Sequence, residues 1–380
     1  MSAVALFVFW ASVSLLAWVY AGYPLLTLAY GRLRPVPLAS DAPVPQVVTV
    51  GIAVHNAAAE IAGRVADVLA QDFDGHVEIV VASDGSTDAT AAIVRALAQP
   101  EPRLRLIELP RAGQSAAQAA IFDTARGEVV VLTDSETRWA PGFLRALLTP
   151  FTDRRVGCTT GVLRWRYDAP SDTAAHEGLY WRYEQAVRHW ESRAGWLSAG
   201  TGALLATRRS IYRPAPAHAS LDQLLPLLTR AQRMLVLSVA SAVGTDRGSS
   251  TLAEQVNSRI RIATQGIEAN LRMAARITPW RSPGPALAIW SHKILRWMTP
   301  WLASAAAAAA LVLVATGEVG YFVALAAGAA LGALAALGYG ARRIGRSVPL
   351  ATLALSVLAV NACFALAWVN VLLRRRIGSW

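Results

Sequence analysis

The sequence is poor in charged residues. Asp, Glu, Lys and Arg make up 16% of its 380 residues, against about 25% in ordinary globular proteins, and no charged side chain precedes Arg32. Hydrophobic residues make up 54%, so the chain as a whole is not intrinsically disordered, because disordered chains are poor in apolar residues. Most of the charges lie in the middle of the sequence, which also excludes a protein embedded entirely in the bilayer.

Cysteine is scarce as well. The chain has two, Cys158 and Cys363, one in the polar middle of the sequence and the other in an apolar run. A disulfide framework is therefore not expected, and the main domain is predicted to lie in a reducing compartment.

The charge-free start of the chain predicts a membrane anchor. Residues 3–23 are almost wholly apolar and long enough to cross a hydrocarbon core of about 30 Å as a helix. A cleaved signal peptide is the alternative, but no basic residue precedes the apolar run. Arg32 and Arg34 follow directly and place that end in the cytoplasm. We expect an anchor over residues 1–31 and a proline-rich linker over residues 32–46.

The C-terminal part predicts further membrane helices within residues 297–380. Its uncharged stretches, residues 297–317, 319–341 and 347–373, are each long enough to span. The positive-inside rule places Arg342 and Arg343 in the cytoplasm. If all four stretches cross, however, Arg374–Arg376 end on the opposite side, and the sequence leaves this conflict open. Residues 246–296 are predicted to form amphipathic interfacial helices, with the basic and aromatic stretch 290–297 on anionic headgroups.

Residues 47–245 alternate short β-branched runs with Ala-rich amphipathic stretches. Strands are predicted over residues 47–54, 77–82, 104–108 and 129–133, and helices over residues 59–70, 89–98 and 115–125. This alternation is typical of an α/β fold with a Rossmann-like, mostly parallel sheet and helices on both faces. Ligands of such sheets bind beyond the carboxyl ends of the strands, so the residues that follow each strand are the candidates for chemistry.

Polar side chains follow three of the predicted strands. They are His55-Asn56, the run Ser83 to Thr90, and Asp134-Ser135-Glu136. Each has a structural alternative: the second run also fits a turn with a helix N-cap, and an isolated Asp-x-Glu is commonly a solvated loop. Carboxylate oxygens at such a turn suit Mg²⁺ or Mn²⁺, which can bridge a diphosphate.

Taken together, the motifs resemble those of the family 2 glycosyltransferases with the GT-A fold, over roughly residues 47–300. The matching segments are His55-Asn56-Ala57-Ala58, Gln71-Asp72-Phe73-Asp74, Ser83-Asp84-Gly85-Ser86-Thr87-Asp88, the stretch Gly113 to Ala119, and Ala125-Arg126-Gly127-Glu128 through Asp134-Ser135-Glu136. The downstream segments resemble the membrane-bound processive and lipid-acceptor branch. Ala57, Ala58 and Ser83 stand where the family usually has acids, and Glu136 replaces the second Asp of its Asp-x-Asp.

The resemblance implies roles for individual residues. It places a divalent metal on Asp134 and Glu136, the acceptor on Trp181, Gly200, Thr201 and Gly202, and the catalytic base at Asp222, which takes the proton of the acceptor hydroxyl. It implies nucleotide-sugar binding by His55, Asn56, Asp84, Gly85, Arg111, Gln114, Asp134, Arg261 and Gln265. Without the resemblance, Asp222 reads as an acid that offsets a helix dipole, and Arg261 as part of a solvated helix.

The net charge of +11 adds an expectation about partners, because it favours anionic ones. The resemblance implies an inverting transferase of the inner membrane with a cytoplasmic catalytic domain. It would move a sugar from a UDP-sugar to a lipid or polysaccharide acceptor in exopolysaccharide or glycolipid synthesis, with possible export-complex subunits as partners. The alternatives are a catalytically inactive nucleotide-sugar-binding partner of a synthase, and a protein that binds nucleic acid or anionic lipid. The scattered basic residues argue against nucleic acid.

Overall fold

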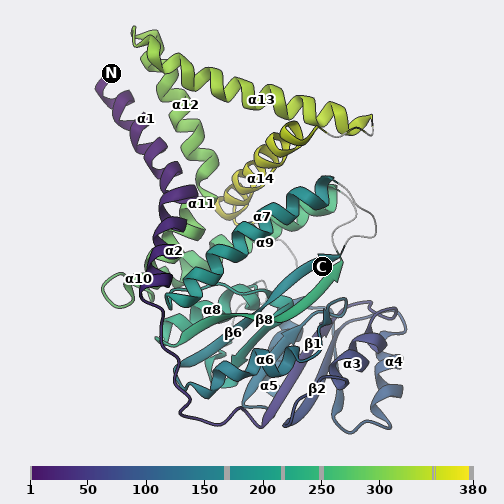
Figure 1. The fold of residues 1–380 in the computed structure, drawn as a ribbon. Coiled ribbons are helices and arrows are strands. Elements are labelled where there is room, and N and C mark those ends of the chain that lie inside the picture. Colours follow the sequence, from purple (N-terminus) through teal and green to yellow (C-terminus); the bar gives the residue numbers. More distant parts are fainter. Residues whose placement is uncertain are drawn as a thin grey trace.

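The computed structural model describes residues 2–166, 172–214, 219–247, 252–344, 346 and 348–375. An α/β domain lies beneath a group of long apolar helices, and amphipathic helices lie between the two parts (Figure 1).

The first half of the sheet is parallel, as the sequence predicts. It contains β1 (Val47–Val54), β2 (His76–Asp84), β3 (Leu104–Leu109) and β4 (Val129–Thr133), in the order β3-β2-β1-β4. Seven of the eight residues of β1 are buried, because helices cover both faces of the sheet, and β-branched side chains suit such a doubly buried strand. The four predicted strands are confirmed to within two residues at each end.

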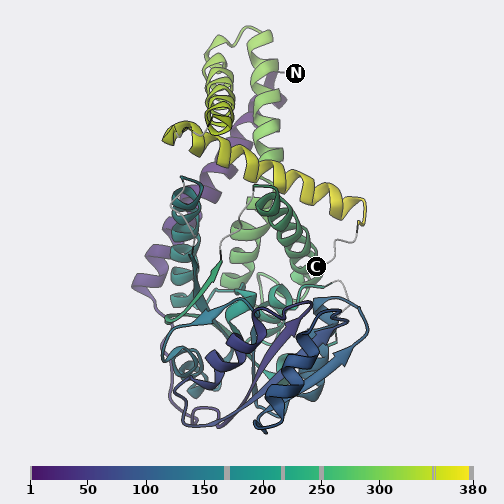
Figure 2. The ribbon, with the colours of Figure 1, turned by 90° about the vertical axis from the view of Figure 1, so that its right-hand side faces the viewer.

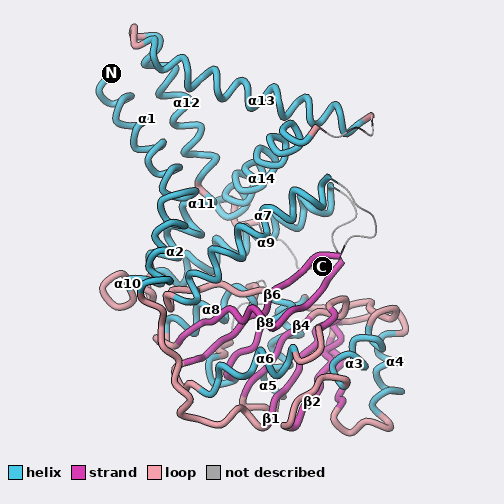
Figure 3. Tube along the Cα trace, viewed as in Figure 1, coloured by secondary structure: helices cyan, strands magenta, loops and turns pink. Residues whose placement is uncertain are grey.

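The second half of the sheet contains antiparallel pairs that the sequence did not reveal. It contains β5 (Arg138–Trp139), β6 (Val156–Arg166), β7 (Leu205–Arg208) and β8 (Leu235–Arg247). The full order is β3-β2-β1-β4-β7-β6-β8-β5, in which β7 runs antiparallel to β4 and β6, and β5 runs antiparallel to β8. The strands of this sheet are the magenta segments of Figure 3. The predicted domain boundary at residue 245 falls inside β8, which continues to Arg247.

Two hydrophobic clusters cover the two faces of the sheet. One packs α3 (Ile61–Leu69), α4 (Thr90–Ala98) and α6 (Phe143–Leu148) on one face. The other packs α5 (Gln114–Thr124) and α8 (Leu221–Ala231) on the opposite face. The second cluster continues into residues of the apolar helices, including Phe364 and Ala367. The α/β domain and the apolar helices therefore share one hydrophobic core.

Two long amphipathic helices separate the sheet from the apolar helices. They are α7 (Asp172–Arg193) and α9 (Leu252–Ala274), and both lie in this intermediate layer in Figure 1. After α9 the chain forms α10 (Pro283–Ala288), a π-helical segment (Ile289–Ile294) and the short α11 (Leu295–Trp297).

The apolar helices include three that are long and apolar enough to cross a membrane. They cover Ser2–Leu33, Val319–Arg343 and Pro349–Leu372. The first contains α1 (Ser2–Ala17), a π-helical turn (Trp18–Gly22) and α2 (Tyr23–Leu33), and the other two contain α13 (Phe322–Arg343) and α14 (Pro349–Leu372). The remaining predicted span is α12 (Thr299–Ala315). It is long and apolar enough to cross a membrane only together with Pro283–Trp297, and the two segments are bent by 61° relative to each other.

The apolar helices are not all aligned. Helices α1 and α12 run alongside each other, whereas α14 runs across this pair and packs on α9 (Figures 1 and 2). The end of α14 thereby returns toward the α/β domain.

A buried group of charged residues, which we call the junction cluster, connects these layers. Its centre is the carboxylate of Glu184 on α7, which is 3.0 Å from Arg188 Nε, 3.1 Å from His292 Nε2, 3.2 Å from Lys293 Nζ and 2.6 Å from Arg296 Nη1. Although burial opposes it, these cations hold the pKa of Glu184 well below its usual value. The basic side chains of residues 290–297, predicted to face lipid headgroups, instead point into the protein.

The junction cluster also includes the N-terminal helix. The hydroxyl of Tyr23 donates to Glu191 Oε1 at 2.5 Å, and His292 Nδ1 lies 2.8 Å from the same oxygen. Tyr23, Glu191 and His292 are all buried. The first span is thus bonded to α7 and to the segment before α12.

Candidate active site

The loops after β1 and β2 are bonded to each other. Nδ1 of His55 is 2.8 Å from the backbone oxygen of Asp84, and the backbone N–H of Thr87 donates to Asn56 Oδ1 at 2.8 Å. Asn56 has a positive φ of 52°, a conformation that Asn adopts more readily than most residues. The predicted donor-binding residues His55, Asn56 and Asp84 therefore lie together at one edge of the sheet.

Asp84 holds the next loop in place. Its buried carboxylate accepts hydrogen bonds from the backbone N–H groups of Ala112 at 2.6 Å and Gly113 at 2.9 Å, and Arg111 Nη1 is 3.3 Å away. Gly85 has a φ of +61°, and a Cβ there would lie 2.8 Å from the backbone nitrogen of Arg111. The chain then enters α5 at Gln114. The six predicted residues of this edge are thus neighbours: His55, Asn56, Asp84, Gly85, Arg111 and Gln114.

Three carboxylates act electrostatically on Asp134, which follows β4. Asp134 and Glu136 follow β4, Asp246 lies near the end of β8, and Asp222 lies in the first turn of α8. Burial and then the charges of Asp246, Asp222 and Glu136 raise the pKa of Asp134 to about 7. The structure therefore brings together the three predicted acids, and it adds Asp246, which the sequence reasoning missed.

The pairing of β5 with β8 positions Asp246. Arg138 pairs with Thr245, and the hydroxyl of Thr137 donates to Asp246 Oδ2 at 3.3 Å. The only sequence signal for Asp246 was a polar end on a long β-branched run. Over the described residues, no three His, Cys, Asp or Glu side chains are already arranged as metal ligands.

A buried arginine lies under the loop that carries Asp134. Arg64 of α3 is fully buried, and it donates to Thr133 Oγ1 at 3.1 Å and to the backbone oxygen of Thr137 at 2.9 Å. It also pairs with Asp67 and lies 4.0 Å from the ring centroid of Trp139. Burial lowers its pKa to about 10, so it stays charged at neutral pH.

Sequence reasoning missed Arg64, although a signal was present. Arg64 lies on the same face of α3 as the buried Ile61, Val65 and Val68, because residues three and four apart share a helix face. An arginine at a core position of an amphipathic helix needs a buried partner. Here the partners are the oxygens around the Asp134 loop.

The predicted base and the predicted acceptor glycines are in contact. The hydroxyl of Ser220 bonds to Asp222 Oδ1, and a Cβ on Gly202 would lie 2.8 Å from Asp222 Oδ2. The backbone N–H of Thr201 donates to Thr160 Oγ1 at 2.9 Å. Gly202 therefore lies against the carboxylate of Asp222, and Thr201, next to it, is held by Thr160.

This segment is connected to the junction cluster through Arg188. Nη1 of Arg188 donates to Thr201 Oγ1 at 3.2 Å and lies 3.4 Å from the backbone oxygen of Gly200. Trp181, the other predicted acceptor residue, lies on the same helix, and its ring centroid is 5.8 Å from that of Trp165.

The predicted diphosphate-binding residues of α9 lie beside the start of α8. Gln265 lines a small cavity together with Ser220, the residue that bonds to Asp222. Arg261 lies one turn earlier on α9 and so shares a helix face with Gln265. The structure thus places Gln265 near the base.

Comparisons with known proteins agree with this architecture. Residues 49–214 match the model of glycosyl transferase family 2. The succinoglycan biosynthesis protein ExoO of Rhizobium meliloti is 40% identical over 106 residues, which cover 28% of this chain and 29% of that protein. An N-acetylglucosaminyltransferase of the same organism is 25% identical over 225 residues, covering 56% of this chain and 51% of that protein. The chain thus spans about half or less of these relatives.

A solved structure extends the likeness to the apolar helices. This structure is the mannosyltransferase PcManGT from Pyrobaculum calidifontis in complex with GDP-Man and Mn²⁺. The two chains superpose with a TM-score of 0.71, and the superposition covers 97% of this chain and 99% of PcManGT. At 23% identity this likeness establishes the fold. The family match, the relatives and the fold together confirm the predicted family for the matched part of the chain: residues 49–214 form a glycosyl transferase family 2 domain with the GT-A fold.

Proposed function

We propose that the protein transfers a sugar from a nucleotide diphosphate donor, a UDP-sugar, to a membrane-proximal acceptor with inversion at the anomeric carbon. The observation that carries the proposal is the acidic site after β4, where burial and then the charges of Asp246, Asp222 and Glu136 raise the pKa of Asp134 to about 7. Such a shift marks a site where burial and like charges gather for chemistry. The relatives named for succinoglycan and N-acetylglucosaminyl transfer support a role in polysaccharide or glycolipid synthesis.

The acidic residues fit a divalent cation. The donor set is made of carboxylate oxygens, which Mg²⁺ and Mn²⁺ prefer, and the repulsion among these carboxylates is relieved when a cation binds. Asp134 and Glu136 are the proposed ligands, with Asp246 beside them. When bound, the cation neutralises the charge that develops on the leaving diphosphate. The solved neighbour with GDP-Man and Mn²⁺ supports this assignment.

Asp222 performs the proton transfer in this proposal. Its carboxylate takes the proton of the acceptor hydroxyl as that oxygen attacks the anomeric carbon. The bond between that carbon and the diphosphate oxygen breaks, and the nucleotide diphosphate leaves with the electron pair. The backbone of Gly202 lies against Asp222, which places the predicted acceptor segment beside the base. Arg64 holds the Asp134 loop from beneath.

The test is release of UDP by the purified chain in a neutral detergent with a panel of UDP-sugars and Mn²⁺. We expect release to depend on the cation and to fall on Asp134→Ala and on Asp222→Asn. Absence of release with every donor, or release that is unchanged in both variants, would contradict the proposal. Mass spectrometry of products formed with native membrane extract identifies the acceptor.

One observation favours a second candidate, a nucleotide-sugar-binding subunit without activity. The carboxylate of Asp84 is already bonded to the N–H groups of Ala112 and Gly113, and Ala57, Ala58 and Ser83 stand in place of acids that the family usually has. Tight UDP binding without turnover, in the presence of native membranes, would favour this candidate.

We also propose that the catalytic domain faces the cytoplasm at the inner membrane. Arg32 and Arg34 lie at the end of the first span, and Arg342 and Arg343 lie at the end of α13. Both positions agree with the positive-inside rule. The crosswise course of α14 (Figure 2) supports a helix that lies along the interface. Its end, at Arg374, then returns to the cytoplasmic side, which removes the conflict left by four crossing helices.

A further inference from the structure

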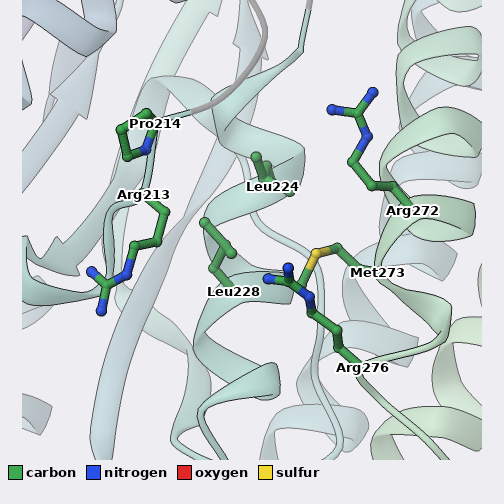
Figure 4. Close-up of a pocket in the computed structure, with 7 residues that line it drawn as sticks. All are labelled: Arg213, Pro214, Leu224, Leu228, Arg272, Met273 and Arg276. Carbon is green, nitrogen blue, oxygen red and sulfur yellow. The ribbon is translucent and has the colours of Figure 1, made fainter.

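A cavity of about 400 Å³ lies between α8, the end of α9 and the loop that follows β7. Figure 4 shows Leu224 and Leu228 of α8 in the middle, Arg213 and Pro214 of the loop on one side, and Arg272, Met273 and Arg276 on the other. The cavity therefore has a basic rim and an apolar floor. The predicted base Asp222 is not part of its lining.

The three arginines of the rim carry charge that the protein does not neutralise. Within the described residues, none of Arg213, Arg272 and Arg276 forms an ion pair with a carboxylate. Arg213 donates only to the backbone oxygens of Ser210 at 2.6 Å and Tyr212 at 2.7 Å. Three guanidinium groups around one hollow repel each other unless an anion lies between them. Guanidinium binds phosphate with paired, parallel hydrogen bonds.

The floor of the cavity is continuous with the membrane part of the molecule. Leu224, Leu228 and Met273 belong to the same hydrophobic cluster as Phe364 and Ala367 of α14. Trp280, in the loop that follows α9, is 80% exposed. An exposed tryptophan beside arginines is typical of a segment at the membrane interface. Because Trp280 follows Arg276 by four residues, the rim of the cavity lies near this interfacial segment.

The cavity also leads toward the predicted base. A second, smaller cavity shares Leu224 and Arg272 with it and reaches Ser220. The hydroxyl of Ser220 bonds to Asp222. The smaller cavity is only about 10 Å³, room for at most one water molecule, so the side chains at the start of α8 have to move before an acceptor bound among the arginines reaches Asp222.

We propose that this pocket binds the diphosphate of a lipid-linked acceptor, a sugar carried on a lipid diphosphate. The proposal rests on the proposed transferase function. A hydroxyl acceptor needs a base such as Asp222 to take its proton. A lipid phosphate that attacked the sugar directly would need no base, because its oxygen is already ionised. We therefore place the sugar hydroxyl at Asp222 and the diphosphate at Arg213, Arg272 and Arg276. The new bond joins that hydroxyl oxygen to the donor's anomeric carbon, and UDP leaves.

The experiment is isothermal titration of the full chain, in a neutral detergent, with farnesyl diphosphate as a soluble lipid diphosphate. Saturating UDP and Mn²⁺ occupy the donor site during the titration. We expect Arg272→Ala/Arg276→Ala to weaken binding about ten-fold or more, since two charge-assisted contacts are lost. Both arginines are exposed, so the fold is kept. Arg213→Ala is a second variant, with a smaller loss expected, and Arg281→Ala is the matched control, with none.

Inorganic pyrophosphate and farnesol separate the two parts of the ligand. We expect both to bind about ten-fold or more weakly than farnesyl diphosphate, because each lacks either the apolar chain or the charge. Pyrophosphate that binds as tightly as farnesyl diphosphate would show a free-anion site and overturn the proposal. Equal affinity of the wild type and the double variant would overturn it as well. UDP binding measured on the same preparations reports separately on the donor site, so failure here is distinguishable from failure of the transferase proposal.

Discussion

Gly202 lies against the carboxylate of Asp222, so closely that a Cβ on Gly202 would be 2.8 Å from both Cβ and Oδ2 of Asp222. Real Cβ contacts are never this short, so position 202 and the Asp222 carboxylate compete for the same space. The contact joins the loop before β7 to the first turn of α8. Glycine is required at position 202 because of this contact and not because of a special φ.

Gly202→Ala is predicted to reduce turnover. The added methyl group displaces the Asp222 carboxylate, and a displacement of about 1 Å can lower a rate about 100-fold. The measurement is the rate of UDP release together with the thermal unfolding midpoint. Gly328→Ala, where nothing lies within 4 Å of the new Cβ, is the matched control. Wild-type turnover in folded Gly202→Ala would contradict the role given to Asp222.

Stabilisation by Mn²⁺ is predicted to increase with pH. The pKa of Asp134 is raised to about 7, so the metal-free folded protein holds a proton that the unfolded chain has already lost at that pH. Stability from this group is therefore lost as pH rises through about 7. A cation replaces the proton, so we expect a larger Mn²⁺-induced shift of the unfolding midpoint at pH 8 than at pH 6. Asp134→Asn should remove this pH dependence. A Mn²⁺-induced shift of equal size at pH 6 and pH 8 in the wild type would refute the prediction.

Arg64→Met is predicted to destabilise the domain by about 3 kcal/mol, because it breaks the buried ion pair with Asp67 and removes the hydrogen bonds to Thr133 Oγ1 and to the Thr137 oxygen. Thermal unfolding in detergent measures the loss. Arg95→Met is the control: Arg95 pairs with Glu108 on the surface, where both side chains are more than half exposed, and such pairs contribute less than about 1 kcal/mol. Equal midpoints for the two variants would rule out the role of Arg64.

The C-terminus is predicted to lie on the cytoplasmic side. A cysteine added after the last residue should react with a membrane-impermeant maleimide only after the cells are opened, because α14 lies along the interface. Glu318→Cys, in the turn between α12 and α13, should react in intact cells. Both Cys158 and Cys363 are buried and give little background. Labelling of the added C-terminal cysteine in intact cells would mean that α14 crosses.

The sequence predicted the parallel half of the domain well and the antiparallel half poorly. Strands β1, β2 and β4 are rich in β-branched residues and almost wholly buried, so pattern and structure agree. Strand β7, with four residues, is too short to show a period, and its pairing with β4 depends on contacts distant in sequence. The same reason hid Asp246, because its place beside Asp134 depends on β5 pairing with β8. The sequence pattern predicts that Lys293 and Arg296 contact lipid headgroups. It cannot reveal their buried partner, Glu184, because Glu184 lies more than 100 residues earlier.

The junction cluster has a practical consequence for how this protein can be handled. Glu184 and Glu191 belong to α7, but their partners come from α2 and from the segment before α12. A water-soluble fragment that lacks the apolar helices and the segment Ile289–Trp297 would leave the buried carboxylates of Glu184 and Glu191 without these partners. Such a fragment should aggregate, so biochemical work on this protein has to keep these helices and this segment.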